Sequence, residues 1–509
     1  MTGRLAASNL TTPNAVTSVY RCRTAGYTAA MVNVCNRGAG PADITIIVSD
    51  TANISDLAGT IEFQTTVNSK GVLERTGIAV GSAQYITIIS SSADISVVVM
   101  GIETGEFDSA ISEIPLPVFT WSSTYGFDNP NGYNSGDDDQ FGKSIAIGNN
   151  YMVAGADMEE DLPGGSGSGK AYVFNTSTGA LTYTLDNPNG YDTAVQDRFG
   201  FAVAISDNHI VVGAPYEDDA NGVSQGKIYV YNPSTGALAR TIDNPSSSYL
   251  RGDQFGWALA IDGSTLLVGA HWYADYDGRA YLINAGTGSV LHTLENPNSY
   301  DEPGTDNDTF GESVAIHGNL CIVGAPHEDK AAAGTAGSRV GAAYIFNVST
   351  GAVVHTLLNP DNDAENDEFG ESVAIHGSYA AVGTPVSGGT GGYVYIYNTT
   401  SGALHTSIAA PADSNRIGNL RSIAMNADYV FIGDNAATVD SQTSQGKVYV
   451  YRISTGALVH TIVNPQTASG TNNAQYFGSA VAAIGNRIAV AEERHRVGVN
   501  NFAGKAHIY

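Results

Sequence analysis

The stretch FGESVAIHGNLCIVGAPHED at residues 310–329, continued by GAAYIFNVSTGAVVHTLLNP at 341–360, shows the pattern that decides the fold. It predicts four strands: SVAI, the apolar run CIVGAP, the alternating aromatic and aliphatic run AAYIFN, and AVVHTL. Short apolar or alternating runs joined by glycine-bearing turns are typical of antiparallel strands. The stretch therefore predicts one four-stranded antiparallel sheet.

The same pattern recurs from about residue 119 to the end of the chain. The pair that opens each unit begins at Phe141, Phe199, Phe255, Phe310, Phe369, Ile417 and Phe477. The sequence ends after a third strand of the last unit, whereas residues 118–127 read as a fourth strand with no third before it. We therefore expect residues 118–127 to pair with residues 477–509, which would close the units into a ring without exposed sheet edges. The predicted fold is all-β, with a seven-bladed β-propeller at residues 119–509.

Residues 119–509 resemble FG-GAP repeats, the units of the integrin α-subunit propeller. The resemblance rests on the Phe-Gly pair and on a second motif of the Gly-Ala-Pro type, which begins at Gly155, Gly213, Gly269, Gly324 and Gly383. The sixth unit departs from it with Asp434-Asn435 after Gly433, and the seventh reads Ala489-Val490-Ala491. The resemblance implies a calcium loop between the motifs, but that interval holds only 12 residues, such as KSIAIGNNYMVA. A calcium loop needs more oxygen ligands than such a strand-like segment offers, so we expect no metal site and no cofactor.

Acidic residues gather in the loops between strands. One set follows the second motif, at Glu159-Glu160-Asp161, Glu217-Asp218-Asp219 and Glu328-Asp329, and another precedes the Phe-Gly pair, at Asp139, Asp197, Asp253, Asp308 and Asp367. Asn-Pro pairs at 129–130, 187–188, 244–245, 296–297, 359–360 and 464–465 share these loops. Because Asp and Asn side chains bond nearby backbone amides in turns, we interpret the acids as structural, with cation binding as the alternative.

Histidines recur in the predicted fourth strands, at His292, His355, His405 and His460. Each belongs to a different unit, so they would not converge on one metal ion. We interpret them as half-exposed strand residues. Of the three cysteines, Cys22 and Cys35 are candidates for a disulfide, and Cys321 stands alone in a strand-like run.

Composition argues against several classes of function. A net charge of −27 opposes binding to nucleic acid or to an anionic membrane. No apolar run is long enough to span a membrane, and the first residues lack the apolar core of a signal peptide. The sequence has no HExxH, Walker loop or Cys-His pairing. We therefore expect no enzyme, and no catalytic, cofactor-binding or metal-binding residues.

Residues 1–112 lie outside the repeat and predict a β-sandwich, joined to the propeller by a linker at 113–118. Its strand candidates are YTAAMVNVCNR, ADITIIVSD, TIEFQTTV, SAQYITIISS and ISVVVMGIE. The segments AAMVNVCNRG, GVLERTGI and SVVVMGIE, at 29–38, 71–78 and 96–103, resemble a small domain of virion structural proteins of tailed phages. The resemblance implies that this domain anchors the chain to a virion or forms an oligomer.

The sequence therefore favours a phage virion protein, a tail fibre, spike or head decoration, whose propeller attaches to a host surface. Expected partners are other virion proteins, further copies of the chain, and a host glycan or protein. We expect the host to be contacted by loops at 157–168, 215–225 and 326–340, since long polar loops carry variable surfaces. A bacterial extracellular adhesin, a glycan-processing enzyme with converging acids, and a purely architectural virion protein remain alternatives.

Overall fold

The computed structural model divides the chain into two compact units, Met1–Thr120 and Trp121–Tyr509. The division falls close to the predicted linker, whose residues 113–118 lie outside the described part of the chain. The structure describes residues 2–10, 16–21, 27–37, 39–49, 60–68, 72–80, 85–92, 95–104, 123–131, 139–159, 167–189, 196–218, 224–246, 252–297, 308–329, 339–360, 366–385, 391–411, 414, 416–465, 474–495 and 503–509.

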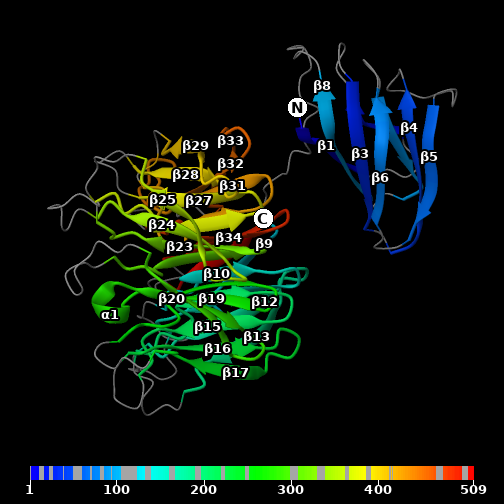
Figure 1. Cartoon of the computed structure of the whole chain (residues 1–509). Helices are drawn as coiled ribbons and strands as arrows, with labels where there is room; N and C mark the ends of the chain where they lie inside the picture. The colour runs from blue at the N-terminus through cyan, green and yellow to red at the C-terminus, as the bar shows by residue number, and fades with distance from the viewer. Residues whose placement is uncertain are drawn as a thin grey trace. The chain divides into compact units, whose positions relative to one another are not determined.

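The first unit consists of two four-stranded antiparallel sheets (Figure 1). In sheet order, one sheet contains β1 (Thr2–Leu10), β8 (Ile95–Thr104), β3 (Tyr27–Asn36) and β6 (Val72–Val80). The other contains β2 (Val16–Arg21), β7 (Tyr85–Ser90), β4 (Ala42–Ser49) and β5 (Thr60–Val67). All five predicted strands are present, and β1, β2 and β6 are additional.

Both sheets of the first unit contribute to one apolar core. Val32 and Val34 of β3 alternate with more exposed neighbours, and Ala42 and Ile44 of β4 do the same from the other sheet. This period of two is what a strand requires when one of its faces is buried. Cys35 is a free thiol, and its proposed partner Cys22 lies outside the described residues.

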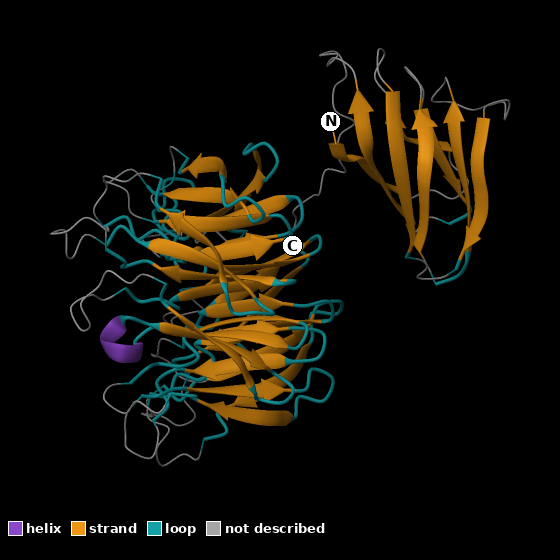
Figure 2. Ribbon diagram, in the orientation of Figure 1, coloured by secondary structure: helices purple, strands orange, loops and turns teal. Residues whose placement is uncertain are grey.

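The described part of the second unit contains seven four-stranded antiparallel sheets, which we number 1 to 7 in chain order (Figures 1 and 2). Sheets 1 to 3 comprise β10 (Ser144–Ile147), β11 (Tyr151–Ala156), β12 (Lys170–Asn175) and β13 (Leu181–Asp186); β14 (Ala202–Ile205), β15 (Ile210–Ala214), β16 (Lys227–Tyr231) and β17 (Leu238–Asp243); and β18 (Ala258–Asp262), β19 (Thr265–Ala270), β20 (Arg279–Asn284) and β21 (Val290–Glu295). Sheets 4 and 5 comprise β22 (Ser313–His317), β23 (Leu320–Ala325), β24 (Ala342–Asn347) and β25 (Val353–Leu358); and β26 (Val373–His376), β27 (Tyr379–Thr384), β28 (Tyr393–Asn398) and β29 (Leu404–Ala409).

Sheets 6 and 7 complete the second unit. They comprise β30 (Ile423–Met425), β31 (Tyr429–Asp434), β32 (Lys447–Arg452) and β33 (Leu458–Val463); and β34 (Phe477–Ile484), β35 (Arg487–Glu492), β36 (Lys505–Ile508) and β9 (Tyr125–Asp128). The short helix α1 (Tyr273–Tyr276) follows β19. Among the described residues, no helix has the length and apolar character needed to cross a membrane.

The two glycine motifs explain how neighbouring sheets approach each other. Within sheet 2, the N–H of Gly200 donates to the carbonyl of Gly213 at 3.0 Å. Gly155 of sheet 1 packs against the carbonyl of the same Gly200, and a Cβ added to Gly155 would lie 1.9 Å from that oxygen. A side chain is therefore excluded where the second motif of one sheet meets the Phe-Gly pair of the next.

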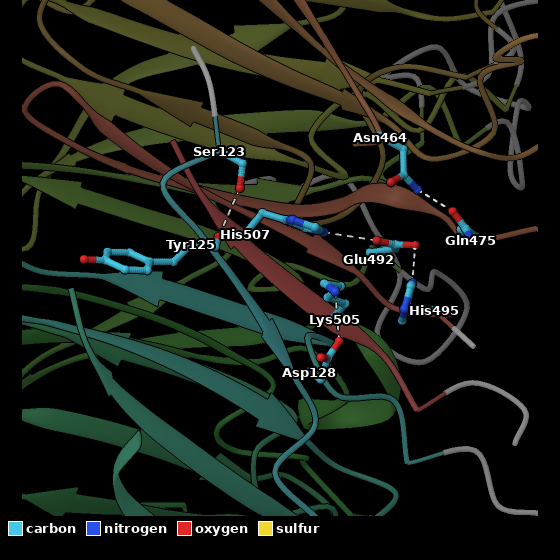
Figure 3. Close-up of polar contacts among 9 residues, drawn as sticks. All are labelled: Ser123, Tyr125, Asp128, Asn464, Gln475, Glu492, His495, Lys505 and His507. Atoms are coloured by element: carbon cyan, nitrogen blue, oxygen red, sulfur yellow. Dashed lines mark hydrogen bonds and ion pairs between the residues drawn. The ribbon is translucent and has the colours of Figure 1, made fainter. Parts of the chain in front are cut away.

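Sheet 7 combines the two ends of the second unit, as the sequence predicts. Strand β9 pairs antiparallel with β36, and Lys505 Nζ lies 2.9 Å from Asp128 Oδ1 across this pair (Figure 3). The predicted pairing is thereby confirmed for residues 125–127, while residues 118–122 lie outside the described residues.

The first strands of the sheets are also in contact in sequence order. Each of β10, β14, β18, β22, β26, β30 and β34 contacts the next, and β34 contacts β10. Between sheets 7 and 1, a Cβ on Gly504 would lie 2.0 Å from the carbonyl oxygen of Phe141. The repeated four-stranded sheets are consistent with a β-propeller.

Candidate functional site

The acids before the Phe-Gly pairs bind the asparagines of the Asn-Pro pairs. Asn187 Nδ2 donates to Asp197 Oδ2 at 2.9 Å, and Asp197 is 1% exposed. Equivalent bonds join Asn129 to Asp139, Asn244 to Asp253, Asn296 to Asp308 and Asn359 to Asp367. In the last loop Asn464 donates to Gln475 instead, at 2.6 Å (Figure 3). These acids hold the loop that leads from one sheet to the next.

The glutamates after the second motif point inward rather than to solvent. Glu217 is buried and accepts hydrogen bonds from Tyr229 at 2.6 Å and Lys227 at 2.7 Å. Glu159 and Glu328 accept the hydroxyls of Tyr172 and Tyr344 in the same way. The three pairs occupy equivalent positions and brace the loop against the third strand. Of the loops predicted to contact a host, residues 160–166, 219–223 and 330–338 lie outside the described residues.

Sheet 7 has a different arrangement at this place (Figure 3). Its buried Glu492 lies between His495, whose Nδ1 is 2.8 Å from Oε1, and His507, whose Nε2 is 3.1 Å from Oε2. Burial alone would raise the pKa of Glu492, but the two histidine contacts outweigh it and lower the pKa. The glutamate–tyrosine pair of sheets 1, 2 and 4 is thus replaced by a carboxylate between two imidazoles.

The histidines of the fourth strands form contacts between sheets. The Nε2 of His292 bonds the carbonyl of Ser349 at 3.0 Å, and that of His355 bonds the carbonyl of Thr399 at 3.1 Å. His405 reaches Ile453 in the next sheet at 3.0 Å. Within the described part of the chain, no group of three or more His, Cys, Asp or Glu side chains is arranged to hold a metal ion.

A cavity of about 150 Å³ lies where the first strands of all seven sheets meet. Its lining includes Ser144, Ala202, Ala258, Glu312, Ser372, Arg421 and Ala480, one from each sheet or the residues just before it. Small residues dominate the strand positions, so the chemistry comes from the few large polar side chains. We call this space the axial cavity.

One position of the repeat carries a polar or aromatic side chain in every sheet. The residue after each Phe-Gly pair is Lys143, Phe201, Trp257, Glu312, Glu371, Asn419 or Ser479, in sheet order. Sheet 6 contains two more residues than the other sheets between its two glycine motifs. Arg421 lies in this longer segment, shortly after the Ile417-Gly418 pair. The repeat needs no particular side chain at this position, and Glu312 is the residue there that lines the cavity.

Arg421 spans the axial cavity. Its guanidinium donates to the carbonyl of Lys143 in sheet 1 and to that of Trp257 in sheet 3, both at 3.3 Å. It also lies 4.3 Å from the ring centroid of Phe201 in sheet 2, a cation–π distance. Burial lowers the pKa of Arg421 to about 10, so the side chain remains charged at neutral pH.

Two ion pairs lie near Arg421. Lys143 Nζ is 3.0 Å from Glu493 Oε1, and Arg198 Nη1 is 3.8 Å from Asp157 Oδ2. Asp157 is fully buried, and neither of its carboxyl oxygens has a hydrogen-bond partner among the described residues. Burial raises the pKa of Asp157 to about 6, against the opposing effect of the nearby cations.

Three glutamates lie at the junction of sheets 4 and 5, and one of them, Glu312, lines the cavity. Burial raises the pKa of Glu312 to about 7 and that of Glu371 to about 8, and the charge of Glu368 contributes to both shifts. The N–H of Leu420 donates to Glu371 Oε1 at 3.2 Å. His327 Nε2 lies 4.0 Å from Glu368 Oε1, but burial lowers the pKa of this histidine.

An aromatic cluster lies beside Arg421, which contacts Phe201 and the carbonyl of Trp257. The ring centroids of Phe201 and Trp257 are 4.3 Å apart, and those of Trp257 and His271 are 4.1 Å apart. Tyr216 lies next to both Phe201 and Trp257, at 6.3 and 6.4 Å. The Trp257 Nε1 is buried without a hydrogen-bond partner among the described residues.

Sequence reasoning named no site residue, so this constellation was missed. The sequence did offer one signal. The residue after the Phe-Gly pair differs from unit to unit, from lysine to an aromatic residue to glutamate, although the rest of the repeat is regular. The reach of Arg421 across the cavity had no comparable signal, because it depends on an irregular loop with positive φ at Arg421.

The comparisons with known proteins agree with the repeat. The FG-GAP repeat family matches residues 132–174, 190–231, 247–283, 301–346 and 355–397, which fall on sheets 1 to 5. No curated protein matches the chain significantly. The chain thus carries five FG-GAP repeats within an all-β architecture of repeated four-stranded sheets.

Proposed function

We propose that the chain is a structural protein of a tailed-phage virion, in which the second unit attaches the particle to a host surface. The single observation that carries the attachment role is the axial cavity, whose lining of small and aliphatic residues includes the charged side chains of Glu312 and Arg421. Concave surfaces that combine aromatic and convergent polar groups are the usual sites of ligand recognition.

For the second unit, we propose a closed seven-bladed β-propeller, each sheet forming one blade. The succession of contacts from β10 through β34 and back to β10 supports closure. The close approach of Gly504 to Phe141 between sheets 7 and 1 supports it independently, because the same approach joins the other sheets. In such a ring the axial cavity and the loops after the second motif share one face, since the hydrogen bond between Gly142 and Gly155 places them at the same end of a blade.

For the first unit, we propose a β-sandwich that docks to the particle or joins copies of the chain. Its two sheets share one apolar core, as a sandwich requires. The virion role is supported by the resemblance of segments 29–38, 71–78 and 96–103 to tailed-phage structural proteins. Many copies on one particle would make weak individual contacts sufficient through avidity.

A cryo-electron microscopy reconstruction of the parent particle tests this proposal. We expect a seven-bladed disc projecting from the tail or capsid, rooted by the first unit. Finding the chain on a bacterial surface or in culture medium, and on no particle, would replace the virion role with the adhesin alternative.

Attachment is tested separately with the purified chain as a competitor of phage adsorption. The wild-type chain should reduce adsorption, and a Glu312→Ala variant, altered in the lining of the cavity, should compete less. Thr241→Ala, on an exposed outer strand, is the matched control. If the particle carries the chain but neither protein competes, the role is architectural.

The junction of Glu312, Glu368 and Glu371 favours one second candidate, a glycan-processing enzyme. Two carboxyl groups with different protonation states can serve as acid and base in glycoside hydrolysis. Incubation of the chain with isolated host surface polysaccharide tests this: release of shorter saccharides that Glu371→Gln abolishes would establish the enzyme, and unchanged polysaccharide would exclude this activity on that substrate.

A further inference from the structure

Sheet 3 differs from its neighbours in the loop after the second glycine motif. Sheets 1, 2 and 4 have a buried glutamate four residues after the motif glycine, and each accepts the hydroxyl of a third-strand tyrosine: Glu159, Glu217 and Glu328. Sheet 3 has Tyr273 at this position, directly after Trp272. The guanidinium carbon of Arg279, on the third strand β20, lies 3.6 Å from the ring centroid of Tyr273. A cation–π contact thus replaces the carboxylate–hydroxyl contact, and aromatic side chains occupy the start of the loop.

The aromatic side chains of this loop extend the cluster around Trp257. The ring centroid of His271 is 4.1 Å from that of Trp257 and 5.7 Å from that of Trp272. Trp272 in turn meets Tyr276 of α1 at 5.0 Å, with the two rings inclined by 65° (Figure 1). Phe201 and His271 are buried, whereas the other rings are half-buried. Two of the chain's three tryptophans therefore lie in one partly exposed row of rings. We call it the aromatic surface, which consists of Tyr216, Trp257, Trp272 and Tyr276.

Tyr276 takes part in the aromatic surface in spite of an unfavourable backbone conformation. Its φ is +81°, a value that bulky residues rarely adopt. The carbonyl of Tyr276 accepts the N–H of Thr309 at 2.8 Å, which comes directly before a Phe-Gly pair. Sheet 1 makes the equivalent bond, from Arg198, with the carbonyl of Gly167, and a glycine adopts positive φ without strain. Strained positions of this kind cluster at functional sites.

Charged groups next to the aromatic surface are neutralised within the protein. Arg198 covers a tyrosine ring of the surface at 4.8 Å and lies 3.8 Å from the carboxylate of Asp157. Arg279 contacts both carboxyl oxygens of Glu295, at 2.8 and 2.6 Å. Burial lowers the pKa of His271 well below its ordinary value, so this imidazole is uncharged at neutral pH. These groups therefore leave no unpaired cation beside the rings to attract an anionic ligand.

The aromatic surface is also distinct from the aliphatic surface of the unit. The exposed large hydrophobic side chains among the described residues all lie on the outer strands, from Leu181 of β13 to Val463 of β33. A partner that binds by half-buried rings alone needs a flat apolar face with polar groups around it. A pyranose ring has this shape, because C–H groups form its face and hydroxyls surround its edge. A nucleic-acid base would stack as well, but a net charge of −27 opposes its phosphates.

We propose that the aromatic surface binds a neutral oligosaccharide, with one sugar ring stacked on Trp272 beside Tyr276 and further units along Trp257 and Tyr216. None of these four residues lines the axial cavity, so the site is separate from it. Tyr216 lies in the loop at 215–225 that the sequence predicts to contact a host. The inference deepens the attachment role and rests on it for one point only, that the oligosaccharide belongs to a host surface.

Isothermal titration calorimetry of the full chain with tetrasaccharides tests the proposal. Cellotetraose, N-acetylchitotetraose and lacto-N-neotetraose are the neutral probes. The tetrauronic acid made by oxidising the primary hydroxyls of cellotetraose keeps the linkage and the length but carries carboxylates, so it is the matched charged control. We expect at least one neutral probe to bind and the acid to bind at least about tenfold more weakly, since the chain itself is strongly acidic.

Variants locate the binding and separate it from folding. Trp272→Ala should weaken the bound tetrasaccharide at least about tenfold. Leu404→Ala is the control, because it removes an exposed apolar side chain from β29, outside the aromatic surface, and should leave the affinity unchanged. Tyr276→Gly removes the ring and relieves the positive φ, so it should weaken binding while the melting temperature stays the same or rises. A ring with a merely structural role would show the reverse, a lower melting temperature with unchanged affinity.

Three outcomes would overturn the proposal: no binding of any neutral probe, binding of the acid as tight as that of the tightest neutral probe, or full affinity of the Trp272→Ala chain. Failure of the attachment role looks different. A chain that binds a neutral tetrasaccharide but does not compete with phage adsorption would keep this site and lose the attachment role. A chain that competes with adsorption but binds none of the neutral probes would keep the attachment role and lose this site.

Discussion

Gly155 of one sheet rests against the backbone carbonyl of Gly200 in the next, so closely that a Cβ on Gly155 would lie 1.9 Å from that oxygen. Backbone atoms do not give way as a flexible side chain does. We therefore expect Gly155→Ala to force sheets 1 and 2 apart and to lower the free energy of unfolding by about 3 kcal/mol or more. Thermal and denaturant unfolding of the full chain measure this.

Gly148 supplies the control for this substitution. A Cβ there would meet the side chain of Ile205 at 3.5 Å, an ordinary contact. Gly148→Ala should change the stability by no more than about 0.5 kcal/mol. If the two alanine variants unfold alike, the close approach of the glycine motifs does not determine how the sheets pack.

Strand β9 should contribute much of the stability of sheet 7. Its Phe127 is 4% exposed, and the ring centroid lies 4.7 Å from that of Phe174 in sheet 1. Phe127→Ala should cost about 3–5 kcal/mol by opening a cavity between sheets 7 and 1. Tyr125→Phe removes only the 2.6 Å bond from the hydroxyl to the carbonyl of Ser177, so it should cost about 1 kcal/mol. Equal effects would mean that the β9 strand is held by its backbone alone.

The repeat made most of the second unit predictable, because each strand carries its own signal. The run from Cys321 to Val323 is apolar at consecutive positions and forms a strand buried on both faces, β23. The phase of the repeat further predicted that residues near 125 complete the last sheet. Local pattern and long-range pairing agree here, as they do in regular repeats.

Other features required the structure because they depend on departures from the repeat. In sheet 7, Ala491 occupies the place of the second-motif glycine, and its Cβ approaches Gly142 of sheet 1. The contacts of Glu492 with two histidines arise because His495 and His507 stand where other sheets have glutamate and tyrosine. Arg421 reaches sheets 1 and 3 only when its backbone takes a positive φ. None of these follows from a single repeat unit.

The buried Glu492 should stabilise the fold in a pH-dependent way. Its folded pKa is lowered by His495 and His507, so its stabilising effect is present above the ordinary carboxyl pKa and is lost as the pH falls through the folded pKa. Glu492→Gln should therefore cost about 1–2 kcal/mol at pH 7 and less at pH 4. Unfolding at both pH values measures this, with Asp440→Asn as the exposed control. A cost that does not shrink at pH 4 would show that the charge of Glu492 is not what the histidines bind.

Glu312 and Glu371 should show the opposite dependence. Burial and neighbouring charge raise the folded pKa of Glu312 to about 7 and of Glu371 to about 8, so the folded state holds protons that the unfolded state has released. Stability then falls as the pH rises from the ordinary carboxyl pKa to the raised values, because ionising these groups in the fold is unfavourable.

The Glu312→Gln/Glu371→Gln chain removes this ionisation. Relative to wild type, it should gain stability between pH 5 and pH 8, with a difference in melting temperature that grows by about 2–4 °C across that range. Melting curves of both proteins at pH 5, 6.5 and 8 measure the trend without any ligand. A difference in melting temperature that stays constant with pH would mean that the two carboxyl groups are already ionised in the folded protein. Their charge would then be stabilised by water or by Arg421.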